Sequence, residues 1–195
     1  MNPTETLRLF LAIQIPEPIR LELHRLQHEL QPLLPPGVAR WTGPEQLHLT
    51  LKFLGNVPES NISVLNDAAL AVCAATPPLQ LQMQGTGFFP NEFSPRIFWA
   101  DVKSLALQKF QQQLETAVEP FTQKHESKKF SAHVTLARFE KMRRRDVEKL
   151  MAHAQTSKTF GQWTAHEVEL VQSKLKQTGA VYATVAVYRT KSEYP

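Results

Sequence analysis

A histidine and a threonine stand two residues apart, among apolar residues, at two places in this chain. The first segment is HLTL (residues 48–51) within LHLTLKFLG, and the second is HVTL (residues 133–136) within AHVTLARF. Alternate side chains of a strand point to opposite faces, so each segment predicts a strand with one apolar face and one face carrying His and Thr. Two ordinary half-exposed strands are the alternative interpretation, since Thr and Leu are both common in strands.

The rest of the chain alternates predicted strands and helices in an order that indicates an α+β fold. Strands are predicted at 7–14, 47–55, 79–85, 94–102, 132–139, 166–175 and 180–189, and helices at 16–30, 60–75, 105–121 and 145–154. Consecutive strands without a helix between them favour antiparallel pairing. Each motif strand is followed by a helix and then a strand pair, and the histidines are 85 residues apart (133 − 48). We therefore expect residues 1–195 to form a single domain of two pseudo-symmetric lobes. In this bilobal fold, antiparallel sheets carry outer helices and one motif strand per lobe lines a central cleft.

Charge and cysteine content narrow the function classes only a little. A net charge of +4 and a pI near 9.3 favour an anionic partner such as a phosphate or a nucleic acid. One cysteine, Cys73, cannot form an intrachain disulfide, and its Ala-rich surroundings predict a buried helix position rather than a nucleophile. The N-terminus lacks the pattern of a signal peptide and no run is long enough to span a membrane, so a cytoplasmic protein without an obligate protein partner is expected.

The two motifs together suggest acid–base chemistry at phosphorus. One imidazole can accept a proton near pH 7 while a second, protonated one donates, and two hydroxyls can donate hydrogen bonds to phosphate oxygens. No HExxH, cysteine pair, Walker loop or GxSxG elbow is present, so neither a metal nor a cofactor is expected. His24 and His28 have a ligand-like i, i+4 spacing, but their polar neighbours favour a solvated helix face.

At these residues the chain resembles the two-histidine phosphoesterase superfamily, specifically the RNA 2′,3′-cyclic phosphodiesterases long called 2′-5′ RNA ligases. The segments that carry the resemblance appear in order along nearly the whole chain: RLFLAIQIP, HLTLKFLG, GFFPNEFSPRIFWADV and HVTLARF. The resemblance implies metal-independent hydrolysis of a 2′,3′-cyclic phosphate to a 2′-phosphomonoester, with a reversible 2′-5′ ligation of RNA ends. A related phosphoesterase on 2′-5′ oligonucleotides or a cyclic ADP-ribose phosphate, and a non-catalytic RNA-binding module, are the alternatives.

The resemblance also implies roles for particular residues. His48 would be the proton donor, His133 the proton acceptor, and Thr50 and Thr135 would hold the phosphate. Arg138, five residues after His133, would contact the substrate or lie at the rim of the cleft. Strict alternation would point Arg138 away from His133, so it must lie past the strand or beyond a bulge.

Other residues have two interpretations each. Family members often carry Arg-Pro-Phe-x-Pro before the second histidine, whereas this chain has KKFSAH (residues 128–133), which leaves phosphate contact by Lys128 or Lys129 open. Phe10 and Trp41 are candidates to stack a base, with positions in the core as the alternative. The basic run KMRRR (residues 141–145) could meet RNA phosphates or simply begin a solvated helix.

Overall fold

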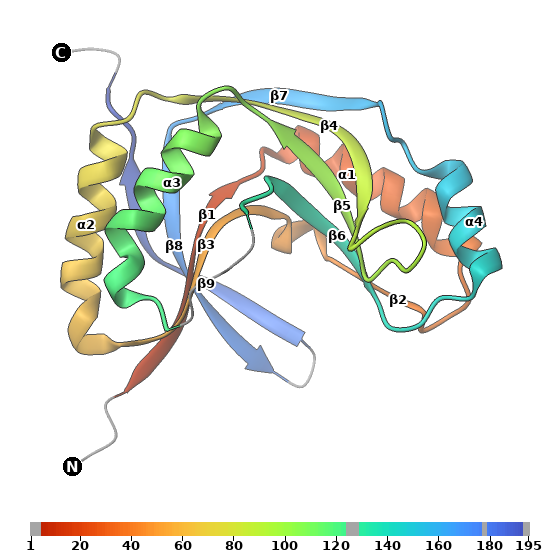
Figure 1. The fold of residues 1–195 in the computed structure, drawn as a ribbon, viewed down its shortest axis with the longest axis horizontal. Coiled ribbons are helices and arrows are strands. Elements are labelled where there is room, and N and C mark those ends of the chain that lie inside the picture. The colour runs from red at the N-terminus through yellow and green to blue at the C-terminus, as the bar shows by residue number, and fades with distance from the viewer. Residues whose placement is uncertain (1–4, 124–128, 177–178, 193–195) are drawn as a thin grey trace.

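In a computed structural model, residues 5–123, 129–176 and 179–192 are described, and they form one antiparallel sheet with four α-helices (Figure 1). The nine strands of this part of the chain are β1 (Thr6–Gln14), β2 (Ala39–Trp41), β3 (His48–Pro58), β4 (Leu79–Phe89), β5 (Ile97–Lys103), β6 (His133–Phe139), β7 (Thr159–Ala165), β8 (Glu167–Lys176) and β9 (Gly179–Arg189). The helices are α1 (Glu17–Leu30), α2 (Ile62–Ala74), α3 (Leu107–Val118) and α4 (Arg144–His153). The α+β prediction is confirmed.

The two motif strands lie side by side in the middle of the sheet. The strand order is β7-β4-β5-β6-β3-β1-β8-β9, with β2 added beside β6. Strands β3 and β6 share the single register pair Leu49–Val134, so they join the two halves at one point. Read outward from this point, each half has a motif strand and then three further strands. That residues 1–195 form one domain of two pseudo-symmetric lobes stays a prediction, which this matching order supports.

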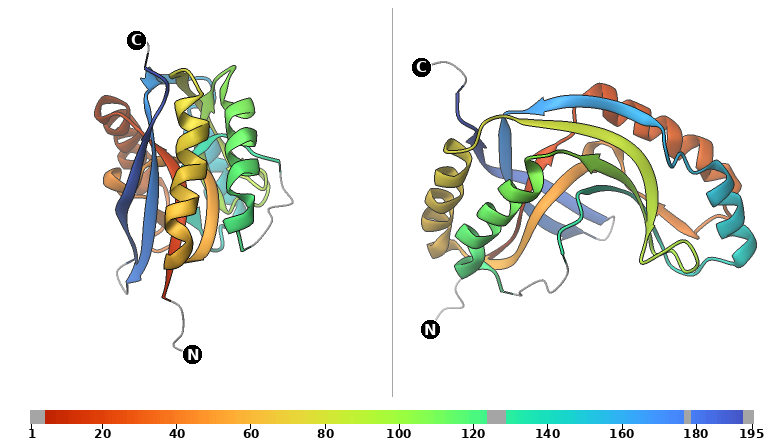
Figure 2. Two further views of the ribbon diagram at one scale, coloured as in Figure 1. Left: turned by 90° about the vertical axis from the view of Figure 1, so that its left-hand side faces the viewer. Right: turned by 45° about the horizontal axis from the view of Figure 1, so that its top comes forward.

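Two helices cross from one half of the sheet to the other. Helix α1 follows β1 but packs against β7, and α3 follows β5 but packs against β3 and α2. Figures 1 and 2 therefore show α2 and α3 at one end of the molecule and α1 and α4 at the other. Gly161 permits the α1 crossing, because a Cβ at this position would lie 2.7 Å from Cγ1 of Ile19. Each motif strand is thus supported by a helix that starts in the opposite half.

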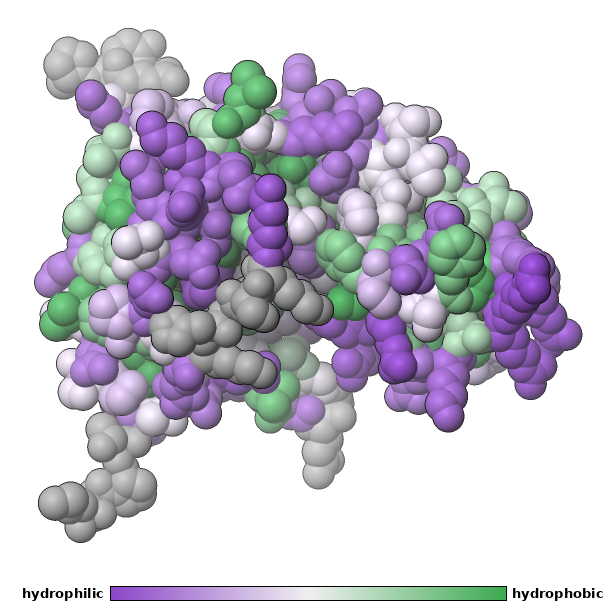
Figure 3. Space-filling view, in the orientation of Figure 1, coloured by the Kyte–Doolittle hydropathy of each residue, from purple (hydrophilic) through white to green (hydrophobic). Residues whose placement is uncertain are grey.

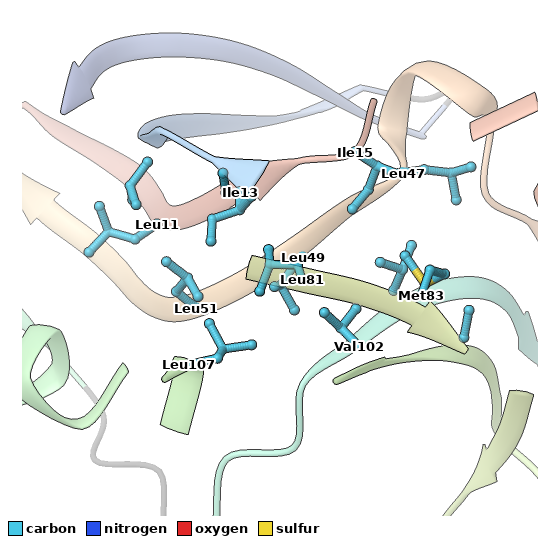
Figure 4. Packing of buried hydrophobic residues seen from close by; sticks show 14 of the residues in the cluster. Leu11, Ile13, Ile15, Leu47, Leu49, Leu51, Leu81, Met83, Val102 and Leu107 are labelled. Atoms are coloured by element: carbon cyan, nitrogen blue, oxygen red, sulfur yellow. The ribbon is translucent and has the colours of Figure 1, made fainter. Parts of the chain in front are cut away.

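The main core lies on the sheet face opposite the motif histidines. Leucine and isoleucine side chains of β1 and β3 meet Leu81 and Met83 of β4 and Val102 of β5 there (Figure 4). The other face holds a second, smaller buried cluster of Phe10, Ala12 and Val171. The sheet therefore buries apolar residues on both faces near β1, while the motif residues remain half-buried.

Two strands were missed by the sequence analysis. Strand β2 was not predicted, and it has only three residues, too few for alternation to identify it. Strand β7 has the sequence TFGQWTA, in which a glycine interrupts the alternation of apolar and polar residues. Both lie in the half of the sheet that contains β6, so the predicted half was two strands too small.

Candidate active site

A β-bulge follows the His-x-Thr segment in each motif strand. In β6, residues Thr135 and Ala137 pair with adjacent residues of β5, so Leu136 is the extra residue. In β3, residues Thr50 and Lys52 pair with adjacent residues of β1, so Leu51 is the extra one. A bulge inserts one residue and resets the alternation of faces.

The bulges decide which residue lies beside each histidine. Leu136 and Ala137 are both buried, and the next side chain, Arg138, is exposed again on the face of His133 and Thr135. In β3 the consecutive residues Leu51 and Lys52 are buried, and Phe53 is exposed at 46% on the face of His48. Arg138 and Phe53 therefore occupy equivalent positions in the two halves. Of the two placements that the sequence analysis left open for Arg138, past the strand or beyond a bulge, the structure has the second.

Each histidine is held by the carbonyl group two residues before it. His48 Nδ1 lies 2.8 Å from the Gln46 oxygen, and His133 Nδ1 lies 2.8 Å from the Ser131 oxygen. A carbonyl oxygen can only accept, so Nδ1 carries the hydrogen in both rings. The second ring nitrogen, Nε2, is then the one that can take or give a proton in a reaction.

The strand register brings the four motif residues together. Leu49 is opposite Val134 in an antiparallel pair, and both side chains are buried in the core. Their neighbours point to the other face. Continued by one residue in each direction, this register sets His48 opposite Thr135 and Thr50 opposite His133, with all four on the same face. The arrangement has the near two-fold symmetry that an acid–base pair around one phosphorus atom needs.

The environment lowers the pKa of both histidines. Burial is the main cause in each case, and the hydrogen bond to the backbone carbonyl partly opposes it. The positive charge of Arg138 lowers the pKa of both rings further. A negative charge acts in the other direction on each ring, from Glu169 on His48 and from Asp101 on His133. The neutral imidazole is therefore favoured at both positions before an anion binds.

Aromatic rings enclose the two imidazoles. On one side, Phe10 stacks on His48 with ring centroids 4.9 Å apart, and Tyr182 meets His48 edge-on at 5.3 Å. On the other side, Phe89 meets the His133 ring edge-on at 5.0 Å, and Trp99 lies 6.5 Å away. These contacts restrict ring rotation and exclude water, which accounts for the burial that lowers the pKa values.

Phe10 and Trp41, the two predicted base-stacking residues, are both largely buried. Phe10 is only 3% exposed and its ring lies between His48, Phe53 and Tyr182. Trp41 is partly buried and packs against the main core. These observations favour the core interpretation for Trp41 and a supporting position beneath His48 for Phe10. The exposed rings on this face are Phe53 and Tyr182, which the sequence analysis did not select.

An arginine outside the motifs also reaches this face. Arg40 of β2 is directly opposite Arg138 of β6, and both are exposed. The neighbours of Arg40 in β2, Ala39 and Trp41, pack toward the core, so Arg40 points the other way. Arg40 was missed because no strand was predicted at β2. The alternation in the three residues Ala-Arg-Trp is the only sequence signal for it.

The remaining candidates lie elsewhere. Cys73 is buried in α2, and burial raises the pKa of its thiol to about 12. Lys128 lies outside the described residues, and Lys129 is exposed. The run 141–145 leads into α4, where Arg144 pairs with Glu148; Figure 3 shows hydrophilic side chains gathered over this end of the molecule. His24 and His28 contact each other on α1, with Nε2 atoms 3.0 Å apart.

The described residues carry neither a metal-binding cluster nor a membrane-spanning helix. Over the described residues, no group of three or more His, Cys, Asp or Glu side chains is placed to hold a metal ion. None of the described helices combines the length and the apolar character needed to cross a membrane.

Comparison with known proteins agrees with this geometry. Residues 15–177 match the sequence profile of the 2′-5′ RNA ligase superfamily. The chain belongs to the 2′-5′ RNA ligase superfamily. Curated members of similar length include an RNA 2′,3′-cyclic phosphodiesterase of Thermus thermophilus, 29% identical over 96% of this chain and 92% of that protein. Another, from Archaeoglobus fulgidus, is 29% identical over 93% of this chain and 99% of that protein.

Two solved structures share the fold of this chain. A crystal structure of a Thermus thermophilus protein superposes with a TM-score of 0.80 at 28% identity, covering 96% of this chain and all of that one. Escherichia coli LigT, complexed with 3′-AMP, superposes with a TM-score of 0.76 at 21% identity over 96% of this chain and all of LigT. At that identity the likeness to LigT shows the fold alone.

Proposed function

We propose that this protein is an RNA 2′,3′-cyclic phosphodiesterase that hydrolyses cyclic phosphate ends to 2′-phosphomonoesters. The observation that carries the proposal is the pair of imidazoles, both held through Nδ1, on one face of two adjacent strands, with a threonine two residues after each on the same face. The relatives named RNA 2′,3′-cyclic phosphodiesterase support the substrate class. RNA as the partner and a cytoplasmic location belong to the same proposal.

The proposed reaction needs one acid and one base on opposite sides of phosphorus. His133 takes a proton from water as the water oxygen attacks phosphorus, and the bond from phosphorus to O3′ breaks. His48 gives its proton to O3′, and the phosphate remains on O2′. Thr50, Thr135 and Arg138 donate hydrogen bonds to the other phosphate oxygens as their charge increases. A 5′-hydroxyl in place of water gives a 2′-5′ phosphodiester by the same steps, and the reaction is reversible.

Incubation with a 2′,3′-cyclic mononucleotide in EDTA tests the proposal. The expected product is the 2′-phosphate, and its rate of formation should not change on chelation, because the imidazoles and hydroxyls supply the acid, the base and the phosphate donors. Chromatography and phosphorus NMR distinguish the 2′- from the 3′-phosphate. A 3′-phosphate product would contradict the leaving-group assignment. Turnover that needs a divalent ion would contradict the two-histidine mechanism.

The same assay separates the alternatives. A non-catalytic RNA-binding module would bind a cyclic-phosphate RNA and turn over nothing. A phosphoesterase specialised for 2′-5′ oligonucleotides or a cyclic ADP-ribose phosphate would turn those over much faster than the cyclic mononucleotide.

The pair Arg40–Arg138 favours an oligonucleotide over a mononucleotide. Like charges directly opposite on one sheet face destabilise a strand pair. Among the described residues neither guanidinium has an ion pair or a side-chain hydrogen bond, so only solvent screens the repulsion between these two exposed groups. A second phosphate, one nucleotide away from the cyclic end, would offset it. We therefore assign Arg40 to the phosphate that precedes the reacting nucleotide.

Arg40→Ala is expected to lower kcat/KM by about 10-fold on a short RNA ending in a cyclic phosphate, the value of one charge-assisted contact. On the cyclic mononucleotide the change should stay within about twofold, because that substrate has no second phosphate. The salt dependence of binding should lose about one unit of slope. Arg25→Ala, on the exposed face of α1, is the matched control. If Arg40→Ala lowers kcat/KM equally on the RNA and on the cyclic mononucleotide, Arg40 does not bind the preceding phosphate.

A further inference from the structure

Two buried glutamines, one from each crossing helix, reach the bulges of the motif strands. Gln27 of α1 is 1% exposed, and its Nε2 donates to the carbonyl oxygen of Leu136, the bulged residue of β6, at 2.8 Å. Gln111 of α3 is 4% exposed, and its Nε2 donates to the carbonyl oxygen of Leu51, the bulged residue of β3, at 3.3 Å. Each helix therefore supports the bulge in the half opposite to the strand it follows.

The sequences around the glutamines repeat as well. The buried stripe of α1 includes Leu23, Leu26, Gln27 and Leu30, and that of α3 includes Leu107, Phe110, Gln111 and Leu114 at the same spacing. The glutamine occupies the same position in both stripes and is the polar residue among apolar ones. A buried amide destabilises the fold unless it is hydrogen-bonded. The bulge carbonyls supply that partner in both halves.

The Gln27 amide also joins two strands. Its second donated hydrogen bond goes to the carbonyl oxygen of Thr42, 2.8 Å away and directly after β2. The Thr42 N–H in turn donates to the Leu136 carbonyl at 2.9 Å. Gln27 thus fixes the end of β2 against the bulge of β6, where Arg40 and Arg138 are paired.

We propose that Gln27 and Gln111 are positioning residues of this active site. Each holds a bulge that turns the residue five positions after the motif histidine onto the catalytic face. For Gln27 that residue is Arg138, and for Gln111 it is Phe53. The inference rests on the proposed function for its kinetic test, and its geometric part is tested without turnover.

A double-mutant cycle separates positioning from general stability. Arg138→Ala is expected to lower kcat/KM by about 10- to 100-fold, the loss of a hydrogen bond to a charged group. Gln27→Met has a similar shape and no donor, so it should cause a large part of the same loss. In the Arg138→Ala background, Gln27→Met should cost less than about threefold, because the group it positions is already absent. Gln27→Asn, which keeps the amide on a shorter stem, is the second variant if Gln27→Met does not fold.

Gln111→Met is the matched control, since it removes the equivalent contact in the other half. Any loss that it causes should persist in full in the Arg138→Ala background, because the bulge that Gln111 holds carries Phe53 and not Arg138. Equal losses for Gln27→Met with and without Arg138 would make Gln27 a structural residue only and overturn the proposal.

Titration of the histidine rings by NMR gives a readout independent of turnover. Arg138 lowers the pKa of His133, so displacing Arg138 should raise it. Gln27→Met should raise the His133 pKa toward its value in Arg138→Ala, and Gln111→Met should leave it unchanged. If wild-type protein fails to turn over cyclic phosphates but the titration shifts, the proposed function is wrong and the positioning stands. If wild-type protein is active and the His133 titration does not move in Gln27→Met, the positioning is wrong.

Discussion

His48→Ala and His133→Ala are each expected to lower kcat for a 2′,3′-cyclic nucleotide by about 10²–10⁴-fold. A positioned general acid or base contributes a factor of this size. Each ring has its Nδ1 fixed on a carbonyl oxygen and its Nε2 left for the substrate, so neither can replace the other. The double variant should fall by much less than the product of the two factors, because the acid and the base act in one transition state.

His153→Ala is the matched control, because His153 is exposed on α4 and, within the described part of the chain, its ring bonds only the Lys149 carbonyl of its own helix. Its kcat should stay close to the wild-type value. Circular dichroism checks that each variant is folded. A folded His48→Ala or His133→Ala protein with near-wild-type turnover would leave the repeated motif as a coincidence of strand composition.

The same pair predicts the pH profile. Activity needs one protonated and one neutral ring, so kcat/KM should be bell-shaped, with limbs that belong to the pair. Burial lowers the pKa of both histidines below the ordinary 6.5, so the rings lose their protons at lower pH and the maximum should lie below pH 6.5. A bound phosphate anion raises both pKa values, so the kcat profile should be displaced to higher pH. Arg138→Ala removes a positive charge and should displace the kcat/KM profile in the same direction.

The sequence was most informative about β3 and β6, where the alternation of apolar and polar residues also separates the reactive side chains from the core. Apolar residues on one face and His and Thr on the other make β3 and β6 strands whatever surrounds them, and the helix stripes were equally clear. A bulge in β6 was one of the two placements considered for Arg138, and the sequence did not distinguish it from a position past the end of the strand. A bulge depends on partner strands and on a carbonyl contact with Gln27, whose position 109 residues away no local pattern reveals.

The site residues that the sequence analysis missed lie outside the two motifs. They reach the histidines because of how the strands pair, which the sequence does not show. Asp101 faces His133 because β5 pairs with β6, and Glu169 acts on His48 across β1. Tyr182 reaches His48 from β9, at the far edge of the sheet. The crossing of α1 and α3 was equally hidden, since an apolar stripe shows that a helix is packed and not which half it covers. The repeated Leu-x-x-apolar-Gln-x-x-Leu spacing was the available sign that the two helices are equivalent.

Removing the partner of the buried Lys52 ammonium group is expected to lower the free energy of unfolding substantially. Lys52 directly follows the bulge of β3, is 4% exposed, and pairs with Glu115 of α3, which also accepts from Gln111 at 2.9 Å. Glu115→Ala would leave the ammonium buried without its counter-charge. Removing one partner of a buried pair typically costs about 3–5 kcal/mol. Glu115 is 36% exposed, so water can partly replace it, and we expect the free energy of unfolding to fall by about 2–3 kcal/mol.

Three variants and a pH series test this expectation by urea unfolding. Lys52→Met removes the charge and keeps the volume, so Glu115→Ala should cost much less in that background. Glu148→Ala, in the exposed pair with Arg144, should cost less than about 1 kcal/mol. The Lys52 hydrogen bond, with help from Gln111 and against burial, lowers the pKa of Glu115 below its ordinary 4.5. Its contribution to stability is therefore complete above pH 4.5 and is lost as the pH falls through the lower folded-state pKa. The difference in the free energy of unfolding between wild type and Glu115→Ala should therefore shrink in that acidic range. If Glu115→Ala and Glu148→Ala lower the free energy of unfolding equally at neutral pH, α3 does not hold the β3 bulge through the Lys52–Glu115 pair.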